Sequence, residues 1–256
     1  MNILFTICGR AGSKGLKSKN LLLFNSIPLP YYTIAIMEEY RQKYKNIHCC
    51  DIVSSTDSNE LNTMISKVDQ TIYCIDRIPE LSGDSIRKID VIRDAAVQSK
   101  EFFQHDYGMV VDLDITSPLR TLRDLESVIE KRLISEADVV YTVTESRRNP
   151  WFNMVMKHEN GYYSTVNQGF FATRQQTPQV FDMNASIYAY SPGFILSLEA
   201  LFKKSDIVIM RDTGFLDIDS QEDFEMMQVV AAYLFKNDPD FAELYSIAKR
   251  IQESIS

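Results

Sequence analysis

Short apolar runs alternate with longer amphipathic stretches through the first 145 residues of the chain. The short runs are rich in β-branched side chains and predict strands buried on both faces, whereas the longer stretches carry apolar residues at helical spacing. We expect strands at 2–8, 48–54, 71–75, 107–113 and 138–143, and helices at 31–44, 58–68, 84–100 and 121–134. This alternation predicts an α/β fold, a doubly wound and mostly parallel sheet whose ligands bind at the carboxyl ends of the strands.

The pattern changes between residues 145 and 185. The stretch WFNMVMKHENGYYSTV has two alternating runs around Glu159-Asn160-Gly161, which indicates a β-hairpin, and the next fifteen residues are polar and punctuated by glycine and proline. Strands resume at 185–190 and 207–211, and helices at 220–236 and 239–254. We therefore expect a single domain, 1–256, with an inserted β excursion. Its aromatic residues either pack under this flap or contact a second copy of the chain: Trp151, Phe152, Phe170 and Phe171.

Composition and charge narrow the classes of function. The net charge is −8, from 35 acidic and 27 basic residues, which argues against a nucleic-acid or membrane-surface protein. The chain has no apolar stretch long enough to cross a membrane and no secretory leader at its start, so we expect a cytoplasmic protein. The cysteines lack the spacing of a zinc site or a disulfide framework and are expected to be reduced core residues: Cys8, Cys49, Cys50 and Cys74. The three histidines show no acidic partner at useful spacing.

A local concentration of positive charge follows the first expected strand, in TICGRAGSKGLKSKNLL. Gly9, Gly12 and Gly15 stand at the end of that strand, where glycine lets backbone amides approach an anion. The spacing matches neither the Rossmann nor the P-loop pattern. On spacing alone, the stretch is either a small-anion site or a flexible, solvated turn.

The stretch from Arg10 to Asn20, RAGSKGLKSKN, closely resembles the nucleotide-binding signature of the acylneuraminate cytidylyltransferases, and further islands of resemblance cover most of the chain. The resemblance implies a fold of the nucleotide-diphospho-sugar transferase type. It also implies that the loop wraps the triphosphate of CTP and that Asn20 lies near the nucleoside. The residues expected at the phosphates, with Gly12 in the same loop, are Arg10, Ser13, Lys14 and Lys19.

Two further islands follow in the order of that family. RIPELSGDS resembles the segment that holds the cytidine, with Arg77 and Asp84 matching, although Asp84 is alternatively a helix N-cap. Here Arg87 and Lys88 replace the small residues usual in the family. DLDITSPLR resembles LQPTSPLR of the sugar-binding region and implies sugar contacts for Thr116 and Ser117. Asp114 takes the place of a glutamine, which favours a different acyl sugar or a metal contact, or else a solvated strand end.

The last two islands concern the acceptor sugar and a metal. RQQTPQVFDMNASIY resembles the acceptor arm of the family, with Arg174, Gln175 and Asn184 as expected sugar-binding residues and Ala185 in the place of a glycine. FLDIDSQEDF contains Asp217 and Asp219, which can face one side of an extended segment; the family's D-x-D at this place binds Mg²⁺. The competing role of helix capping is met by Ser220 and Asp223 alone.

The resemblance implies a Mg²⁺-dependent nucleotidyltransferase that activates a nonulosonic acid with CTP for bacterial surface glycans, acting as a homodimer. The expected catalytic residues are Arg10, Lys14, Lys19 and Asp217. Legionaminic, pseudaminic and N-acetylneuraminic acid all stand as acceptors, with a bacterial diacetylated sugar favoured. The alternatives are a 3-deoxy-manno-octulosonate cytidylyltransferase and a non-catalytic nucleotide-sugar binding protein. A nicotinamide-dependent oxidoreductase is disfavoured because the chain has no G-x-G-x-x-G.

Overall fold

The computed structural model describes residues 1–256 except 13–14, 84, 198, 200, 216 and 256. Its centre is a seven-stranded sheet in the order β11-β7-β10-β6-β1-β4-β5. Neighbouring strands are parallel except where β10 pairs with β6 and β7. The predicted mostly parallel α/β sheet is therefore confirmed. Its strands are β1 (Asn2–Cys8), β4 (Cys49–Thr56), β5 (Tyr73–Asp76), β6 (Met109–Leu113), β7 (Val139–Glu145), β10 (Phe181–Tyr190) and β11 (Ser205–Ile209).

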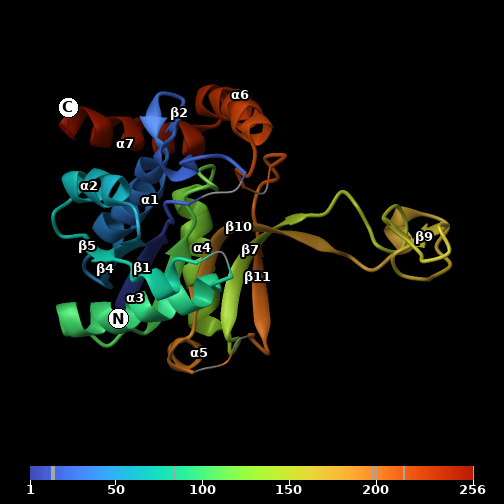
Figure 1. The fold of residues 1–256 in the computed structure, drawn as a ribbon, viewed down its shortest axis with the longest axis horizontal. Coiled ribbons are helices and arrows are strands. Elements are labelled where there is room, and N and C mark those ends of the chain that lie inside the picture. The colour runs from blue at the N-terminus through green and yellow to red at the C-terminus, as the bar shows by residue number, and fades with distance from the viewer. Residues whose placement is uncertain (13–14, 84, 198, 200, 216, 256) are drawn as a thin grey trace.

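Helices cover both faces of the sheet. Successive side chains of a strand point to opposite faces, so Phe5 of β1 packs in one hydrophobic cluster and Leu4 in the other. The second face carries α3 (Lys88–Phe103) and the short α5 (Pro192–Leu196). The first face carries α1 (Leu29–Tyr44), α2 (Asn59–Val68), α4 (Leu122–Ile134), α6 (Gln221–Asn237) and α7 (Pro239–Ile255), of which α7, red in Figure 1, lies against α1 and α6.

Helix starts follow the capping residues of the sequence. Thr121 and Asp124 form a capping box at α4, and Ser220 and Asp223 form another at α6. Both predicted boxes are confirmed. The box at α6 leaves the carboxylates of Asp217 and Asp219 without a capping role.

The start of α3 was predicted wrongly. This helix begins at Lys88 with Arg87 as its N-cap residue, four residues after the expected start at Asp84. The preceding chain instead forms a 3₁₀ turn, Pro79–Leu81, and a further turn in which the Ile86 amide donates to the Gly83 carbonyl. Three elements are too short for periodicity to predict: β2 (Leu23–Phe24), β3 (Ile27–Pro28) and α5.

The β excursion projects as an arm from the body of the molecule (Figure 1). It contains an antiparallel hairpin, β8 (Val155–Lys157) and β9 (Tyr163–Thr165), whose turn includes Gly161 at φ 85°, so the predicted hairpin is confirmed. Because β10 begins at Phe181, the arm is shorter than expected and spans 146–180. Of its aromatic residues, Phe170 is fully exposed and Phe152 is 42% exposed, whereas Trp151 and Phe171 are half-buried.

The cysteines all have free thiols, but they are not all core residues. Cys50 is buried, and Cys8 and Cys74 are half-buried. Cys49 is exposed because it is the first residue of β4, at the edge of the sheet, so its expected place in the core is wrong. Within the described residues, no helix combines the length and apolar character needed to cross a bilayer.

Candidate active site

A cavity of about 310 Å³ opens at the carboxyl ends of the parallel strands, where the fold predicts a ligand. Its walls come from the loop after β1, the turn after β5, the start of α3, the segment after β6 and the segment before α6. Four basic and two acidic side chains are among its described lining residues, which favours an anion. They are Arg10, Lys19, Arg77, Lys88, Asp114 and Asp217.

The loop after β1 is held by its own residues and by β4. The buried Asn20 side chain donates to the Arg10 carbonyl at 3.1 Å, and the Ala11 amide donates to the Asp57 carboxylate at 2.7 Å. Arg10 and Asn20 thereby line the cavity. Gly12 has open space around it, which leaves its backbone accessible. Ser13 and Lys14, expected at the phosphates, lie outside the described residues.

Lys19 joins this loop to the late acidic segment. Its Nζ lies 2.9 Å from the Asp219 carboxylate and donates to the Ile218 carbonyl at 2.9 Å. Gly15 makes a second link, because a Cβ at this position would lie 2.2 Å from the Asp219 carbonyl oxygen. Two segments some 200 residues apart in the chain therefore share one wall of the site.

The two predicted metal ligands take different positions. Asp217 lines the cavity, and burial, with repulsion from the Asp219 and Asp114 carboxylates, raises the pKa of its carboxyl group. The Asp219 side chain is 72% exposed and pairs with Lys19 at the rim. Ile218 stands between these two aspartates, and its amide donates to the Thr116 carbonyl at 2.9 Å. This hydrogen bond holds the acidic segment against the chain after β6.

The end of β4 supports the opposite wall. Arg77, which follows β5, donates to the Ser55 carbonyl at 2.5 Å and to its hydroxyl at 3.3 Å. Ser58 accepts from the Leu61 amide and caps α2, so the structural role predicted for SSTDS is confirmed at this residue. Arg77 is thus oriented along the cavity with part of its guanidinium already bound.

Lys88 is the site residue whose role the sequence did not indicate. Its Nζ lies 2.7 Å from the carboxylate of Asp112 and 2.6 Å from that of Asp114. The Thr116 amide and hydroxyl donate to the other Asp114 oxygen at 3.1 and 3.0 Å. Burial opposes ionisation of Asp114, but the Lys88 charge and these hydrogen bonds outweigh it and lower the pKa of Asp114 to about 2.

A signal for this lysine was present in β6. Asp112 stands inside an apolar strand and is fully buried, and a buried carboxylate requires a counter-charge. Arg120, also fully buried, does not supply it; it donates to the backbone carbonyls of Ser186 and Asp114 and supports the segment after β6 from behind. Lys88 and Asp114, two of the departures from the family pattern, therefore form one ion pair.

Comparison with known proteins shows to which family the chain belongs. The family described as cytidylyltransferase matches residues 4–241, which includes every described wall of the cavity. The chain belongs to the cytidylyltransferase family. It is accordingly a nucleotidyltransferase.

Three similar proteins show how close the similarity is. Post-translational flagellin modification protein B of Campylobacter coli is 35% identical over 227 residues, 88% of this chain and 93% of that protein. The CMP-N,N'-diacetyllegionaminic acid synthase of Campylobacter jejuni is 33% identical over 240 residues, 93% of this chain and 99% of that protein. A solved CMP:2-keto-3-deoxy-manno-octonic acid synthetase, complexed with CTP, shares the fold with a TM-score of 0.63 at 13% identity, over 91% of this chain and 99% of that one.

Several predicted site residues of this cytidylyltransferase do not meet at the cavity. Thr116 lines it, whereas Ser117 is buried beside it. Asn184 is buried in the sheet, where its side-chain oxygen accepts from the Thr142 hydroxyl at 2.7 Å. Arg174 and Gln175 line a second cavity, of about 490 Å³, at the base of the arm. Asp84, expected at the cytidine, lies outside the described residues.

Among the described residues that line the cavity, an activated nucleophilic side chain is not evident. Cys8 lines it, but burial and the Asp112 carboxylate raise the pKa of the Cys8 thiol, which keeps it protonated. The expectation that histidines lack acidic partners is wrong for His105, whose Nδ1 lies 2.7 Å from the Asp51 carboxylate. His105 precedes β6, at the opposite end of the strands from the cavity.

Proposed function

We propose that this enzyme transfers CMP from CTP to a nonulosonic acid, with release of pyrophosphate. The anomeric hydroxyl of the sugar forms a bond to the α-phosphorus as the bond to pyrophosphate breaks, and the hydroxyl proton is released to solvent. The observation that carries the proposal is the basic loop after β1, joined through Lys19 to the acidic segment at Asp217 and Asp219. A triphosphate and the metal that accompanies it require this juxtaposition.

Of the residues proposed at the nucleotide, Arg10, Lys19, Asn20 and Arg77 line the cavity. Arg10 and Lys19 would bind phosphate oxygens by charge-assisted hydrogen bonds, together with Lys14, Ser13 and the backbone of Gly12. The remaining proposed nucleotide contacts, toward the cytidine, are Asn20, Arg77 and Asp84.

Cytidylyltransferases of this type generally use a divalent metal. We propose Mg²⁺, held by Asp217 and Asp219, because hard carboxylate oxygens are the ligands it prefers. The fit rests on the chemistry and placement of the donors, because the Asp217 carboxylate lines the cavity and the Asp219 carboxylate lies two residues later at its rim. When bound, Mg²⁺ neutralises the charge that develops on the phosphate oxygens.

We propose a diacetylated nonulosonic acid such as N,N'-diacetyllegionaminic acid as the acceptor, used for a bacterial surface glycan. The support is the similarity over nearly the full length to a synthase of that CMP-sugar and to a flagellin modification protein. The proposed sugar contacts are Asp114, Thr116, Ser117, Arg174, Gln175 and Asn184. In this chain Asp114 reaches an acceptor together with Lys88, as an ion pair.

The proposal is tested by measuring pyrophosphate release from CTP and Mg²⁺ with a panel of acceptors. The panel contains legionaminic, pseudaminic, N-acetylneuraminic and 3-deoxy-manno-octulosonic acid. We expect turnover with the nine-carbon sugars, and fastest turnover with diacetylated legionaminic acid. Turnover with the eight-carbon sugar alone would contradict the acceptor class, and CTP binding without any release would contradict the enzymatic proposal.

Two acidic variants test the metal site in the same assay. Asp217→Asn should reduce kcat by about 100-fold or more, because it removes a ligand whose interaction strengthens as charge develops. The matched control is Glu222→Gln, at an exposed position in the first turn of α6, which should leave turnover unchanged. Equal activity in both variants would remove Asp217 from the metal site.

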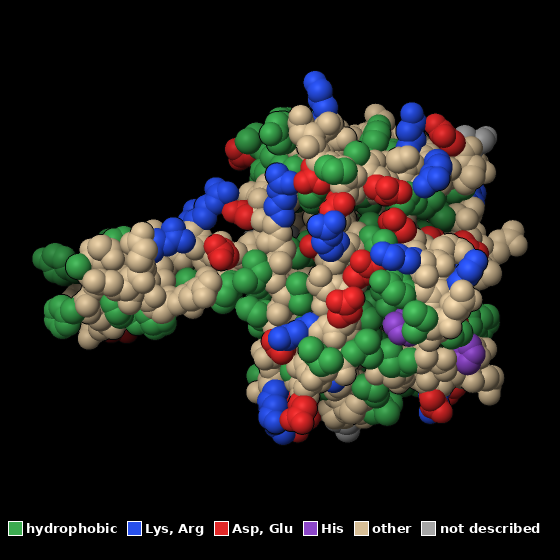
Figure 2. All heavy atoms as spheres, turned by 180° about the vertical axis from the view of Figure 1, so that it is seen from behind, with side chains coloured by type: hydrophobic (Ala, Val, Ile, Leu, Met, Phe, Trp, Pro, Cys, Tyr) green, Lys and Arg blue, Asp and Glu red, His purple; other side chains and the backbone are tan. Residues whose placement is uncertain are grey.

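We propose that the enzyme is a homodimer in which the arm contacts a second copy. The arm carries large exposed hydrophobic residues that a monomer would leave in water, including Tyr162, Tyr163 and Phe170. Figure 2 shows hydrophobic side chains, in green, at the outer end of the arm.

A further inference from the structure

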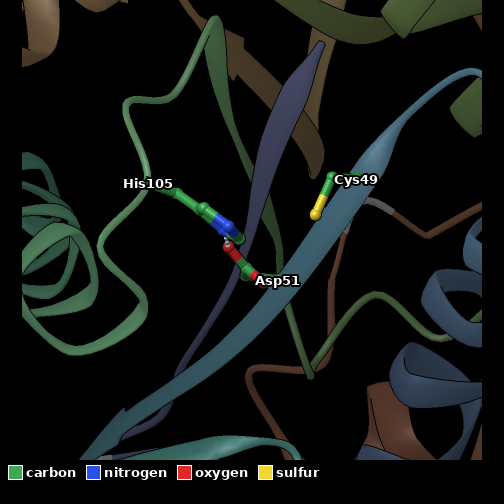
Figure 3. Close-up of side chains that lie close together, drawn as sticks. All are labelled: Cys49, Asp51 and His105. Carbon is green, nitrogen blue, oxygen red and sulfur yellow. Dashed lines mark hydrogen bonds and ion pairs between the residues drawn. The ribbon is translucent and has the colours of Figure 1, made fainter.

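Three potential metal ligands meet at the end of the sheet opposite the nucleotide cavity (Figure 3). Cys49 and Asp51 are two residues apart on β4, so both side chains point to the same side of the strand. His105 reaches them from the loop between α3 and β6. One potential ligand atom from each residue lies within 4.8 Å of those from the other two.

We propose that Cys49, Asp51 and His105 form a second metal site, specific for Zn²⁺ or a metal of similar softness. Thiolate sulfur, imidazole nitrogen and carboxylate oxygen are the three kinds of donor that bind Zn²⁺ in proteins, whereas Mg²⁺ prefers oxygen ligands alone. His105 Nδ1 and an Asp51 oxygen already lie 2.7 Å apart, so zinc binding requires mainly that the Cys49 sulfur move toward them, by side-chain rotation at an exposed strand end. Cys49 is exposed, which leaves a fourth position open to water.

The surrounding residues orient these ligands. The Tyr107 hydroxyl donates to Asp51 Oδ2 at 2.8 Å, and His105 Nδ1 lies 2.7 Å from the same oxygen. The Tyr107 hydrogen bond fixes the direction of the Asp51 carboxylate, and the contact between His105 and Asp51, which zinc would replace, already holds two of the ligands side by side. The Asp51 side chain is 11% exposed and the His105 side chain 35%, so the metal would lie in a shallow site with a solvent path.

The position of the site indicates a structural role rather than a catalytic one. β4 runs from Cys49 to Thr56 before its chain reaches the nucleotide cavity, a distance of roughly 25 Å. In the sheet order, β1 lies between β4 and β6. A metal bound by Asp51 and His105 would therefore clamp the start of β4 to the chain entering β6, across β1.

The test is Co²⁺ titration of the full-length enzyme, stripped of metal with a chelator and kept reduced, in excess Mg²⁺ to occupy hard oxygen sites. We expect one equivalent of Co²⁺ with a thiolate-to-cobalt charge-transfer band in the near ultraviolet, displaced by Zn²⁺. Zn²⁺ should also raise the melting temperature by a few degrees, because it binds only the folded chain. Cys49→Ser should abolish the band, and His105→Gln should weaken Zn²⁺ affinity by at least tenfold.

The matched controls are Cys74→Ser and His158→Gln, a thiol and an imidazole outside the cluster, which should leave the band and the affinity unchanged. Retention of the band in Cys49→Ser would overturn the proposal. So would binding of less than one equivalent in the unsubstituted enzyme, which would leave the cluster as a hydrogen-bonded group that ties the loop before β6 to β4. CTP turnover is measured separately, and its presence or absence does not decide this result.

Discussion

At the scale of single residues, the ion pair between Lys88 and Asp114 determines the charge of the cavity. Without Lys88, two carboxylates, Asp112 and Asp114, would face an anionic substrate from inside the fold. With it, the described lining has an excess of positive side chains. Asp112 and Asp114 lie 24 and 26 residues after Lys88 in the chain, outside its helix. The sequence could therefore reveal that Asp112 needs a counter-charge but not which residue supplies it.

Lys88→Met tests this pairing. The substitution keeps the length of the side chain but leaves Asp112 buried without its cation, and we expect the free energy of unfolding to fall by about 3 kcal/mol. The measurement is urea unfolding near neutral pH. Lys67→Met, at an exposed position of α2, should change stability by less than about 0.5 kcal/mol. Equal effects of the two substitutions would show that Lys88 carries no buried charge pair.

Ala185 has a backbone conformation that is sterically unfavourable for a residue with a side chain. It has φ 48°, in the left-handed region, where β10 shifts its register between Met183 and Tyr188. A glycine avoids the steric cost there, which gives a physical reason for the glycine of the family at this position. The sequence showed the substitution but not the register shift, because a bulge is specified by pairing with β6 and β7.

Ala185→Gly should therefore raise the free energy of unfolding by up to about 1 kcal/mol. Ala189→Gly, in the same strand but with its methyl group fully buried, should lower it by about 1 kcal/mol. Thermal unfolding of both variants gives the comparison. A loss of stability in Ala185→Gly equal to that in the control would contradict a strained conformation at Ala185.

At the scale of elements, the strands and helices of the first half were predicted to within a few residues because their burial is periodic. β1 has the predicted bounds, and α4 begins one residue after its capping threonine. The prediction failed at the start of α3, where the helix begins only at Lys88 and Ser82, Gly83 and Ile86 line the cavity. Amphipathic spacing continues through this segment, but its apolar residues face the site rather than the core.

The contact between α1 and the end of α2 makes stability depend on pH. Burial raises the pKa of Glu38 in α1 to about 7, despite its ion pair with Arg41, which also binds Asp69. Since this folded-state pKa lies above the ordinary value of 4.5, the stabilising contribution of Glu38 is complete below 4.5 and is lost as pH rises through 7.

Glu38→Gln should remove this pH dependence. Between about pH 5 and pH 8, the variant should gain on the order of 1–2 kcal/mol relative to the unsubstituted enzyme, less than the full shift implies because the side chain is partly solvated. Urea unfolding at the two pH values measures this difference. A constant difference in stability at both values would contradict the raised pKa.

At the scale of the whole molecule, the sequence predicts the structure of the body more completely than that of the arm. The body follows from alternating strands and helices, and its ligand site follows from the shared carboxyl ends of the strands. The sequence indicated the hairpin of the arm but not that it projects from the body, because alternating apolar residues specify the pairing of two strands and not the direction in which the hairpin leaves the sheet.

Replacement of Tyr162, Tyr163 and Phe170 by serine should convert the proposed dimer to a monomer. These side chains are 76%, 65% and 107% exposed in the single chain, so their loss should leave the melting temperature of the body nearly unchanged. Sedimentation equilibrium gives the mass. The control substitutes the exposed Met226, Val229 and Tyr233 of α6 and should remain dimeric. A dimer that survives the arm substitutions would place the interface elsewhere.

The most direct test of the account is a crystal structure of the enzyme with CTP and Mg²⁺. We predict the triphosphate against the loop after β1, in contact with Arg10 and Lys19, the metal on Asp217, and the cytidine toward Arg77. A nucleotide bound outside this cavity, or an Asp217 side chain turned away from the metal, would contradict the assignment of the site.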